Sequence, residues 1–467
     1  MNKQLLTACL LAACVAASAQ TKNGGISADM MKKIESNVAA TPAERAIRNA
    51  IATNSITDLA KSPSSLGYID THFSDETTKQ SIHDQKSSGR CWMFSGFNVL
   101  RSRFAAAHND TLAVEFSHSY LFFYDQLEKA NLFLQGTIDN ASKPVSDPDV
   151  RFFFKSPLSD GGTFCGVADL ADKYGLVPKS VMPETYQSNN TKLMAQLIER
   201  KLREFGLELR KMVAEKKKAN AIQDRKTQML GVVYKMLSST LGEPVKEFSY
   251  AHVNKHGKTM GETKTYTPLS FYKETVKSPL NGSFVMLMND PRNPYYKVYE
   301  VEYDRHTYDG HNWKYINLPM EDIEKIAIAS IKANRKMYSS YDVSKFLDRT
   351  RGYMDLNNFD YGSMFGVEFP MSKAERIETF DSGSTHAMTL SAVDLDKDGN
   401  PVKWAVENSW GAASGQNGIY IMTDEWFREY MFRLVVEREY VPADILKIEN
   451  EKPLRLTYDD PLFTPEN

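Results

Sequence analysis

Cysteine is scarce in this sequence, with four residues among 467: Cys9, Cys14, Cys91 and Cys165. A chain of this length can bury a large core without disulfides, and so few cysteines exclude a disulfide framework. The sequence also lacks a surplus of charge of one sign, because 57 Lys and Arg stand against 59 Asp and Glu. A net charge of −2 supplies no global field for binding nucleic acid or an anionic membrane.

Other absences narrow the class of protein further. There is no internal repeat, no low-complexity tract, no phosphate-binding glycine motif and no dinucleotide fingerprint. Hydrophobic residues make up 42% and charged residues 25%, which excludes a wholly disordered, collagen-like or membrane-spanning chain. The length predicts about three structural units, or one core with large insertions.

The first nineteen residues have the pattern of a secretory signal peptide. Lys3 is the only charge before the apolar run Leu5–Ala16, which is too short to span a bilayer, and Ala17-Ser18-Ala19 offers a cleavage site. We therefore expect an exported protein, periplasmic or extracellular, that keeps only two cysteines. An alternative remains open: Leu11-Ala12-Ala13-Cys14 resembles a bacterial lipobox, which would leave a lipid anchor on Cys14.

The mature chain begins with segments of mainly helical pattern. Residues 20–66 read as a helical arm and linker, since Thr41-Pro42-Ala43-Glu44 combines an N-cap, a first-turn proline and a capping-box acid. Residues 67–186 form a mixed, largely helical segment. Residues 187–267 read as a helical insertion with two apolar stripes between Thr191 and Leu241. The basic run Glu215–Lys218 between the stripes is interpreted as a solvated turn rather than a nucleic-acid contact.

Residues 268–448 change to a strand-rich pattern bounded by Gly, Pro, Asn and Asp. The predicted strands are Phe284–Met288, Tyr295–Tyr303, His386–Val393, Lys403–Val406 and Gly418–Met422. The pattern of Asp424–Val436 fits a helix or a strand, and residues 449–467 form a tail.

The segment around Cys91 carries the first chemical signal. Met93, Phe97, Leu100 and Phe104 recur at helical spacing, so a buried helix begins near Cys91. A thiol at a helix N-terminus meets unpaired N–H groups and the positive end of the helix dipole, which favours the thiolate. The amide of Gln85, six residues upstream, could donate to an oxyanion in front of the sulfur.

A thiolate nucleophile needs a group that manages protons, and His386 is the best placed of nine histidines. It opens a predicted strand among small neighbours, and Asn408 follows the next strand 22 residues later. Asp398-Gly399 between them predicts a hairpin, which would bring His386 and Asn408 face to face. The Asn408 amide could then orient the imidazole while Trp410 shields their hydrogen bond from water.

Together these residues resemble the papain superfamily of cysteine peptidases, and more specifically the bleomycin hydrolase / aminopeptidase C family. The resemblance keeps family order from about Asn49 to Asp460. The matching runs are Asp84–Ser95, Asp160–Gly162, Lys173–Lys179, Asn289–Tyr295, Thr385–Thr389, Val406–Gly411 and Met422–Phe427.

The resemblance implies roles for particular residues. Cys91 would be the nucleophile, His386 the general base and acid, Asn408 its orienter and Gln85 the oxyanion donor. Substrate-binding positions would be Gly161, Gly162, Trp410 and the terminal Asn467; glycine suits a wall that pairs with the substrate backbone because it has no side chain to block the approach.

The resemblance also implies an α+β, papain-like fold of two lobes, one helical and one barrel-like, with helical insertions and the N-terminal arm. Peptides would be the substrates, no cofactor would be needed, and the arm would hook protomers into a homohexamer. In this family the C-terminus lies in the cleft and limits cleavage to the free N-terminus of the substrate.

Two features depart from the family pattern. The tail Tyr458–Asn467 differs in chemistry from the usual family ending, with Pro465 and Glu466 near its end, and the export signal is unusual for a largely cytosolic family. The expected function is therefore an exported thiol aminopeptidase, with an endopeptidase of the same chemistry as the alternative. A catalytically idle scaffold or binding protein is the third interpretation.

Three further patterns receive ordinary interpretations. Cys165 is expected to be a core or cleft-wall thiol rather than a partner of Cys91. The run from Asp394 to Gly399 imitates the start of a calcium loop, but Ala405 occupies the position that needs a glutamate, so a hairpin turn is expected. His306 and His311 flank a turn without a third ligand at metal spacing, and no metal site is predicted.

Overall fold

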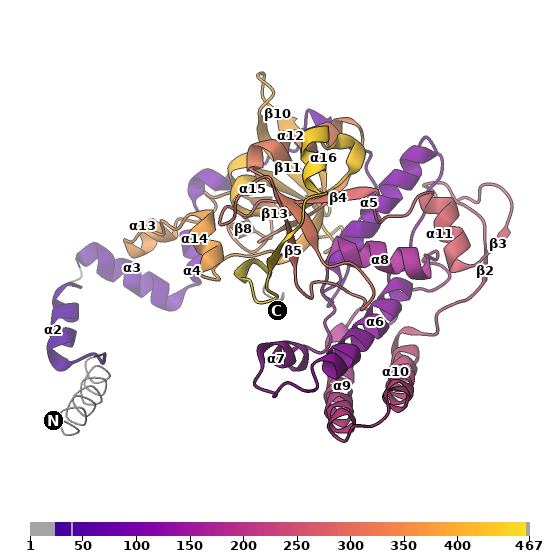
Figure 1. Cartoon of the computed structure of the whole chain (residues 1–467). Helices are drawn as coiled ribbons and strands as arrows, with labels where there is room; N and C mark the ends of the chain where they lie inside the picture. Colours follow the sequence, from indigo (N-terminus) through magenta and orange to yellow (C-terminus); the bar gives the residue numbers. More distant parts are fainter. Residues whose placement is uncertain (1–23, 39–40, 464–467) are drawn as a thin grey trace, which may run out of the picture. The chain divides into compact units, whose positions relative to one another are not determined.

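The computed structural model describes residues 24–38 and 41–463. It contains two compact units (Figure 1): residues up to Lys61 with Phe359–Glu368, and Ser62–Asn358 with Phe369 onward. The predicted signal peptide and Asn467 lie outside the described residues. The helical segment and the helical insertion fall within the second unit, and so does the strand-rich segment apart from Phe359–Glu368.

The first unit is helical, as the pattern of the arm predicts. Its helices are α2 (Ala28–Ser36), α3 (Pro42–Thr53), α4 (Ile56–Ala60) and α13 (Tyr361–Phe365). The predicted capping box is present, with the Glu44 N–H donating to the Thr41 hydroxyl and the Thr41 N–H donating to the Glu44 carboxylate. Neither α2 nor α3 has a buried residue, although both are strongly amphipathic.

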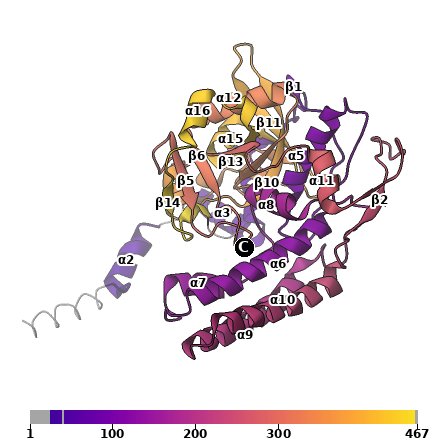
Figure 2. The ribbon, with the colours of Figure 1, turned by 45° about the vertical axis from the view of Figure 1, so that its right-hand side comes forward.

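Helices of the second unit begin at the predicted nucleophile. They are α5 (Cys91–Ala107), α6 (His118–Asp139), α7 (Pro148–Lys155), α8 (Phe164–Tyr174), α9 (Thr191–Ala214), α10 (Ala219–Leu241), α11 (Pro268–Val276), α12 (Met320–Lys332), α14 (Lys373–Glu378), α15 (Asp424–Tyr430) and α16 (Ala443–Ile448), with 3-10 turns η1 (Pro63–Leu66), η2 (Arg438–Tyr440) and η3 (Pro461–Phe463). The predicted insertion is the hairpin α9–α10, which lies along α6 (Figure 2). Its four-residue turn is exposed, as predicted for the basic run. In the described residues no helix is long and apolar enough to cross a membrane.

One large mixed sheet dominates the rest of the second unit. Its strands are β1 (Asp75–Glu76), β4 (Phe284–Met288), β5 (Lys297–Val301), β6 (Lys314–Asn317), β7 (Met337–Tyr341), β8 (Leu347–Asp348), β9 (Tyr353–Met354), β10 (His386–Leu395), β11 (Pro401–Glu407), β12 (Ile419–Thr423), β13 (Met431–Glu437) and β14 (Leu454–Leu456). They are ordered β14-β5-β6-β4-β13-β7-β10-β11-β12-β9-β8, with β1 added on β10. A separate hairpin joins β2 (Phe248–Tyr250) to β3 (Lys264–Tyr266).

The segment 424–436 contains both of the structures that its sequence fits. Residues 424–430 form α15, which Thr423 caps, and residues 431–437 continue as β13 between β4 and β7. Trp426 and Phe427 pack on the sheet from the helix, whereas every residue of β13 is buried. Because both faces of this strand are covered, it lacks the polar–apolar alternation that would have distinguished it.

Helix α5 positions the predicted nucleophile against the sheet. Its predicted apolar positions are all buried, and most of its remaining residues are buried as well. The Asn98 amide donates to the Thr389 hydroxyl on β10 at 3.2 Å, and that hydroxyl donates to the Ser95 carbonyl at 3.5 Å. The first turns of α5 therefore lie against the first residues of β10.

Candidate active site

Cys91 is the first residue of α5, and its side chain is buried. The preceding residue, Arg90, is fully buried, pairs with Glu184 at 2.8 Å, and lies 5.3 Å from the ring centroids of Phe94 and Phe122. Cys91 and Cys165 are both thiols and form no disulfide with each other. The predicted position of Cys91 at the start of a buried helix is confirmed.

His386 and Asn408 face each other across the predicted hairpin. Strands β10 and β11 pair antiparallel, with Thr389 opposite Glu407. The His386 Nε2 lies 2.8 Å from the Asn408 Oδ1, and both residues are buried. Because an amide oxygen only accepts, Nε2 carries the proton of this bond and Nδ1 is the remaining basic nitrogen.

Trp410 covers this pair. Its ring stacks on the His386 imidazole with centroids 4.8 Å apart, and the Arg349 guanidinium lies 4.4 Å from the Trp410 centroid. Burial lowers the pKa of His386 to about 4; the Asn408 hydrogen bond opposes this shift and the charge of Arg349 adds to it. The imidazole is accordingly neutral at neutral pH and available as a base.

The loop that carries Gln85 is joined directly to the Asn408 loop. The Gln85 N–H donates to the Ser409 carbonyl at 2.8 Å, and the Ser409 hydroxyl donates to the Gln85 Oε1 at 2.5 Å. The amide nitrogen of Gln85 donates to the Ser88 carbonyl at 2.6 Å. These bonds fix the Gln85 amide between the segment before Cys91 and the segment after Asn408.

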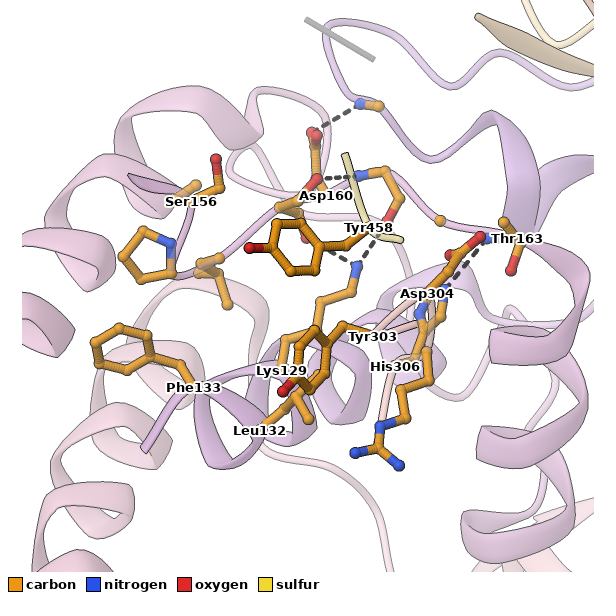
Figure 3. A pocket seen from close by; sticks show the side chains of 18 of the residues that line it. Lys129, Leu132, Phe133, Ser156, Asp160, Thr163, Tyr303, Asp304, His306 and Tyr458 are labelled. Carbon is orange, nitrogen blue, oxygen red and sulfur yellow. Dashed lines mark hydrogen bonds between the residues drawn. The ribbon is translucent and has the colours of Figure 1, made fainter. Parts of the chain in front are cut away.

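Asp160 connects three parts of the site (Figure 3). Its carboxylate accepts the Gly89 N–H at 2.7 Å and the Thr191 hydroxyl at the start of α9, and its carbonyl accepts the Trp92 indole N–H at 2.9 Å. A Cβ at Gly89 would overlap this carboxylate, which explains glycine there. Asp160 thus ties the turn before Cys91 to the helical insertion.

Gly161 and Gly162 follow Asp160 and line a cavity of about 690 Å³. A Cβ at Gly162 would overlap the His306 imidazole and press on Trp92, whereas a Cβ at Gly161 would meet only the Ser159 hydroxyl, at 3.3 Å. Glycine at position 162 is therefore required by the side chains packed against it. The expected reason, free access for a substrate backbone, stays a prediction.

Both aromatic and charged side chains line the cavity, and Figure 3 shows Tyr303 and Tyr458 near its centre. The aromatic lining residues are Phe133, Phe152, Phe153, Tyr303, Tyr458 and Phe463; Gly89 and Ser384 connect the cavity to the segments of Cys91 and His386. The described part of the tail thus ends against the cavity that adjoins the candidate catalytic residues.

Several contacts hold the tail in this place. β14 adds parallel to β5 at the sheet edge, and Tyr458 packs on Phe152 with ring centroids 4.4 Å apart. Asp460 pairs with Arg292 at 2.7 Å, and Arg292 also binds Asp290 through two hydrogen bonds. The last described residue, Phe463, lies under the Arg433 guanidinium at 5.5 Å.

The other residues that the sequence singled out have structural roles. Cys165 is buried against the Thr163 hydroxyl, and burial raises its pKa. Asp396 accepts the backbone N–H groups of Asp398 and Asn400, which confirms the predicted hairpin turn. The sequence did not reveal the roles of Ser409, the Asp160 carboxylate and the buried Asp125 carboxylate, because each binds a residue that is distant in the sequence. Ser409 and Asp160 lay inside the matching runs, which is the one signal that could have found them.

Fold and site together define a papain-like cysteine peptidase: a helix that begins with a cysteine lies against a sheet that bears a hydrogen-bonded His–Asn pair. More particularly, the chain belongs to the Peptidase C1-like family, whose profile matches residues 25–463. Aminopeptidase C of Lactobacillus delbrueckii subsp. lactis is 36% identical over 442 residues, covering 94% of this chain and 98% of the relative.

Two further relatives agree with this assignment. Bleomycin hydrolase of Gallus gallus is 38% identical over 390 residues, covering 82% of this chain and 85% of the relative. The crystal structure of pepw from Lactobacillus rhamnosis superposes with a TM-score of 0.88 at 33% identity, covering 94% of this chain and 99% of that chain.

Proposed function

We propose that this protein is an exported thiol aminopeptidase that removes N-terminal residues from peptides through an acyl-enzyme formed on Cys91. The observation that carries the proposal is the 2.8 Å bond between His386 Nε2 and Asn408 Oδ1, on the strand that packs against the start of α5. The names of the relatives, aminopeptidase C and bleomycin hydrolase, support the substrate class.

In the proposed acylation, the Cys91 Sγ attacks the scissile carbonyl while His386 Nδ1 takes up the thiol proton. The oxyanion accepts hydrogen bonds from the Gln85 amide and the Cys91 N–H. His386 then gives the proton to the leaving amine as the C–N bond breaks, and a thioester remains.

In the proposed deacylation, His386 Nδ1 takes a proton from water as its oxygen attacks the thioester, and the proton returns to the departing thiolate. Asn408 keeps Nε2 protonated throughout, so that Nδ1 alone exchanges protons. The substrate backbone lies along Gly161 and Gly162, and Trp410 covers the His386–Asn408 pair. No cofactor takes part in these steps.

The alternative is an endopeptidase of the same chemistry, because the tail ends in unusual residues. Cleavage of one peptide with a free and with an acetylated N-terminus separates the two, with Cys91→Ala as the control. We expect product from the free peptide alone. Equal cleavage of both peptides would identify an endopeptidase. A Cys91 that neither cleaves peptides nor alkylates faster than an ordinary thiol at neutral pH would identify an idle scaffold.

The tail is proposed to act as the ruler that restricts cleavage to the first residues. Tyr458, Asp460 and Phe463 hold the described end of the tail beside the cavity. Deleting residues 464–467 should therefore shift the products from N-terminal trimming toward internal cleavage, measured by mass spectrometry of a long peptide. An unchanged product pattern would show that another part of the protein limits access.

Export and assembly complete the proposal. Residues 1–19 support export, and N-terminal sequencing of the secreted protein should find Gln20 first; a lipid on Cys14 would support the lipoprotein alternative. The amphipathic helices α2 and α3, which bury nothing within the described chain, support a hooking arm. A homohexamer follows from the family resemblance.

A further inference from the structure

We propose that a buried group of three charged or polar side chains, Lys129, Asp125 and His306, positions the backbone on which the substrate lies. This inference rests on the proposed function, because it assigns a task to residues outside the reacting atoms. Lys129 and Asp125 come from α6, and His306 comes from the loop after β5. All three stand beneath residues 159–163, and Figure 3 shows Lys129 and His306 there.

Asp125 is the centre of the group. It is fully buried, and its carboxylate contacts His306 Nδ1 at 2.6 Å, Lys129 Nζ at 3.0 Å and the Gln126 amide at 2.9 Å. Burial raises the pKa of this carboxyl, but Lys129 and His306 outweigh it and hold the pKa below its ordinary value. A buried carboxylate with this many donors fixes the direction of each of them.

His306 carries this order to the backbone. Its Nδ1 donates to Asp125, so its Nε2 is the acceptor, and the Thr163 N–H donates to Nε2 at 3.2 Å. The imidazole lies between Gly162 and Gly166, where a Cβ on either glycine would overlap it, and it packs on Trp92 with centroids 4.6 Å apart.

Lys129 holds the other end of the same segment. Its ammonium accepts no bond and has three protons to give. It donates to the Ser159 carbonyl at 2.9 Å and to the Gly161 carbonyl at 2.6 Å. Its side chain is 12% exposed and lines the cavity, so this clamp lies at the edge of the site.

The consequence is a backbone segment anchored on both sides of one glycine. Lys129 binds the Gly161 carbonyl and His306 binds the Thr163 N–H. The N–H and carbonyl of Gly162 have no hydrogen bond within the described part of the chain. These two groups are therefore presented in fixed directions to an extended peptide. Lys129, Asp125 and His306 act as positioning residues, because they hold this backbone segment and are not among the reacting groups.

A pair of substitutions at His306 separates positioning from mere filling of space. A glutamine amide reaches the position of Nε2 and can accept from Thr163, whereas an asparagine amide reaches only the position of Nδ1. We expect His306→Asn to raise KM about 10-fold or more with kcat changed less than about threefold, since uniform binding is lost. His306→Gln should restore most of the affinity. His118→Asn, which removes an equally buried imidazole that stacks on Phe94, should leave KM unchanged.

A second readout does not depend on turnover. A peptide aldehyde that occupies the site should protect Cys91 from iodoacetamide, and His306→Asn should need about 10-fold more of it while the unprotected alkylation rate stays the same. Lys129→Met, at the cavity edge, should behave like His306→Asn and serves if the histidine variants do not fold.

Equal KM and equal protection in His306→Asn, His306→Gln and Lys129→Met would overturn the positioning role. An equal loss of affinity in His306→Asn and His306→Gln would also overturn the positioning role. Failure of the proposed function has a different signature: wild-type Cys91 would be protected by no peptide aldehyde and would cleave no peptide, which would remove the premise of this inference as well.

Discussion

At the scale of single residues, the site depends on which nitrogen of His386 carries a proton. The Asn408 oxygen accepts from Nε2, Trp410 covers that bond, and Nδ1 is left as the base. A buried imidazole that lost this acceptor would be free to rotate or to adopt the other tautomer. The role proposed for Asn408 is therefore orientation.

Asn408→Ala should lower kcat by about 10- to 100-fold, a part of what general acid–base catalysis contributes. KM should change little, because Asn408 is not one of the residues that line the cavity. Steady-state kinetics measure the effect, and circular dichroism checks that the fold is intact. A folded variant with wild-type kcat would remove Asn408 from the mechanism.

The titration of His386 also predicts how stability depends on pH. Its pKa falls from the ordinary 6.5 to about 4 on folding, so between these values the unfolded chain binds a proton that the folded chain does not. The free energy of unfolding should therefore decrease as the pH is lowered from 6.5 to 4, by up to about 1.4 kcal/mol per pH unit from this group.

Denaturant unfolding at several pH values measures this contribution, with His386→Gln as the reference because glutamine does not titrate. The wild type should lose stability more steeply than the variant over that range. Parallel curves would show that the His386 imidazole is not held neutral by burial in the folded protein.

At the scale of elements, the start of α5 is fixed by bonds to segments remote in sequence. Ser409 binds Gln85, and the Asp160 carboxylate joins Gly89 to Thr191 at the start of α9. The helical insertion is thereby part of the support of the proposed nucleophile. A peptidase in which this support loosens should bind peptides but react slowly, because small displacements at the reacting centre are costly.

Asp160→Ala should accordingly lower kcat by about 10-fold. Thr191→Val, of similar shape, removes only the bond to α9 and should have a smaller effect in the same direction. Both are measured by single-turnover cleavage, with thermal unfolding to check the fold. Equal kcat in the wild type and in Asp160→Ala would show that the turn before Cys91 needs no support from this carboxylate.

The sequence carried enough information for elements whose pattern is local. The helix after Cys91, the hairpin between His386 and Asn408 and strand β4 follow from periodicity and turn residues. The contact of His306 with Asp125 does not, because 181 residues separate them and a lone histidine near a turn has no distinguishing pattern. The orientation of the Gln85 side-chain amide likewise depends on Ser409, which only the folded chain brings near.

At the scale of the whole molecule, the helical arm stands out because its apolar side chains are exposed. Exposed apolar side chains repeat along its helices: Met30 is 51% exposed, Ile34 40% and Ile47 40%. Apolar stripes of this kind are normally covered. A second copy of the chain is the partner that the proposed assembly supplies.

Deleting residues 20–65 should therefore convert the proposed assembly into smaller species while each chain keeps its fold. Sedimentation velocity measures the change, and a chain with charged residues at Met30, Ile34 and Ile47 is the matched full-length control, which should dissociate likewise. If the deleted protein kept the same number of chains per particle, the arm would have no role in assembly.

The order of the strands in the large sheet has a consequence for the newborn chain. The cysteine at position 91 emerges from the ribosome long before the histidine at 386 and the asparagine at 408, which reach it only when β10 and β11 have formed beside β7. The strand β14 and the tail segment at the cavity are translated later still. Since chains begin to fold during synthesis, a partly made molecule carries the proposed nucleophile without its proposed base, and the candidate site and the tail beside it are completed only in the last stretch of translation. In the proposed mechanism the protein would therefore gain peptidase activity only when its chain is nearly complete.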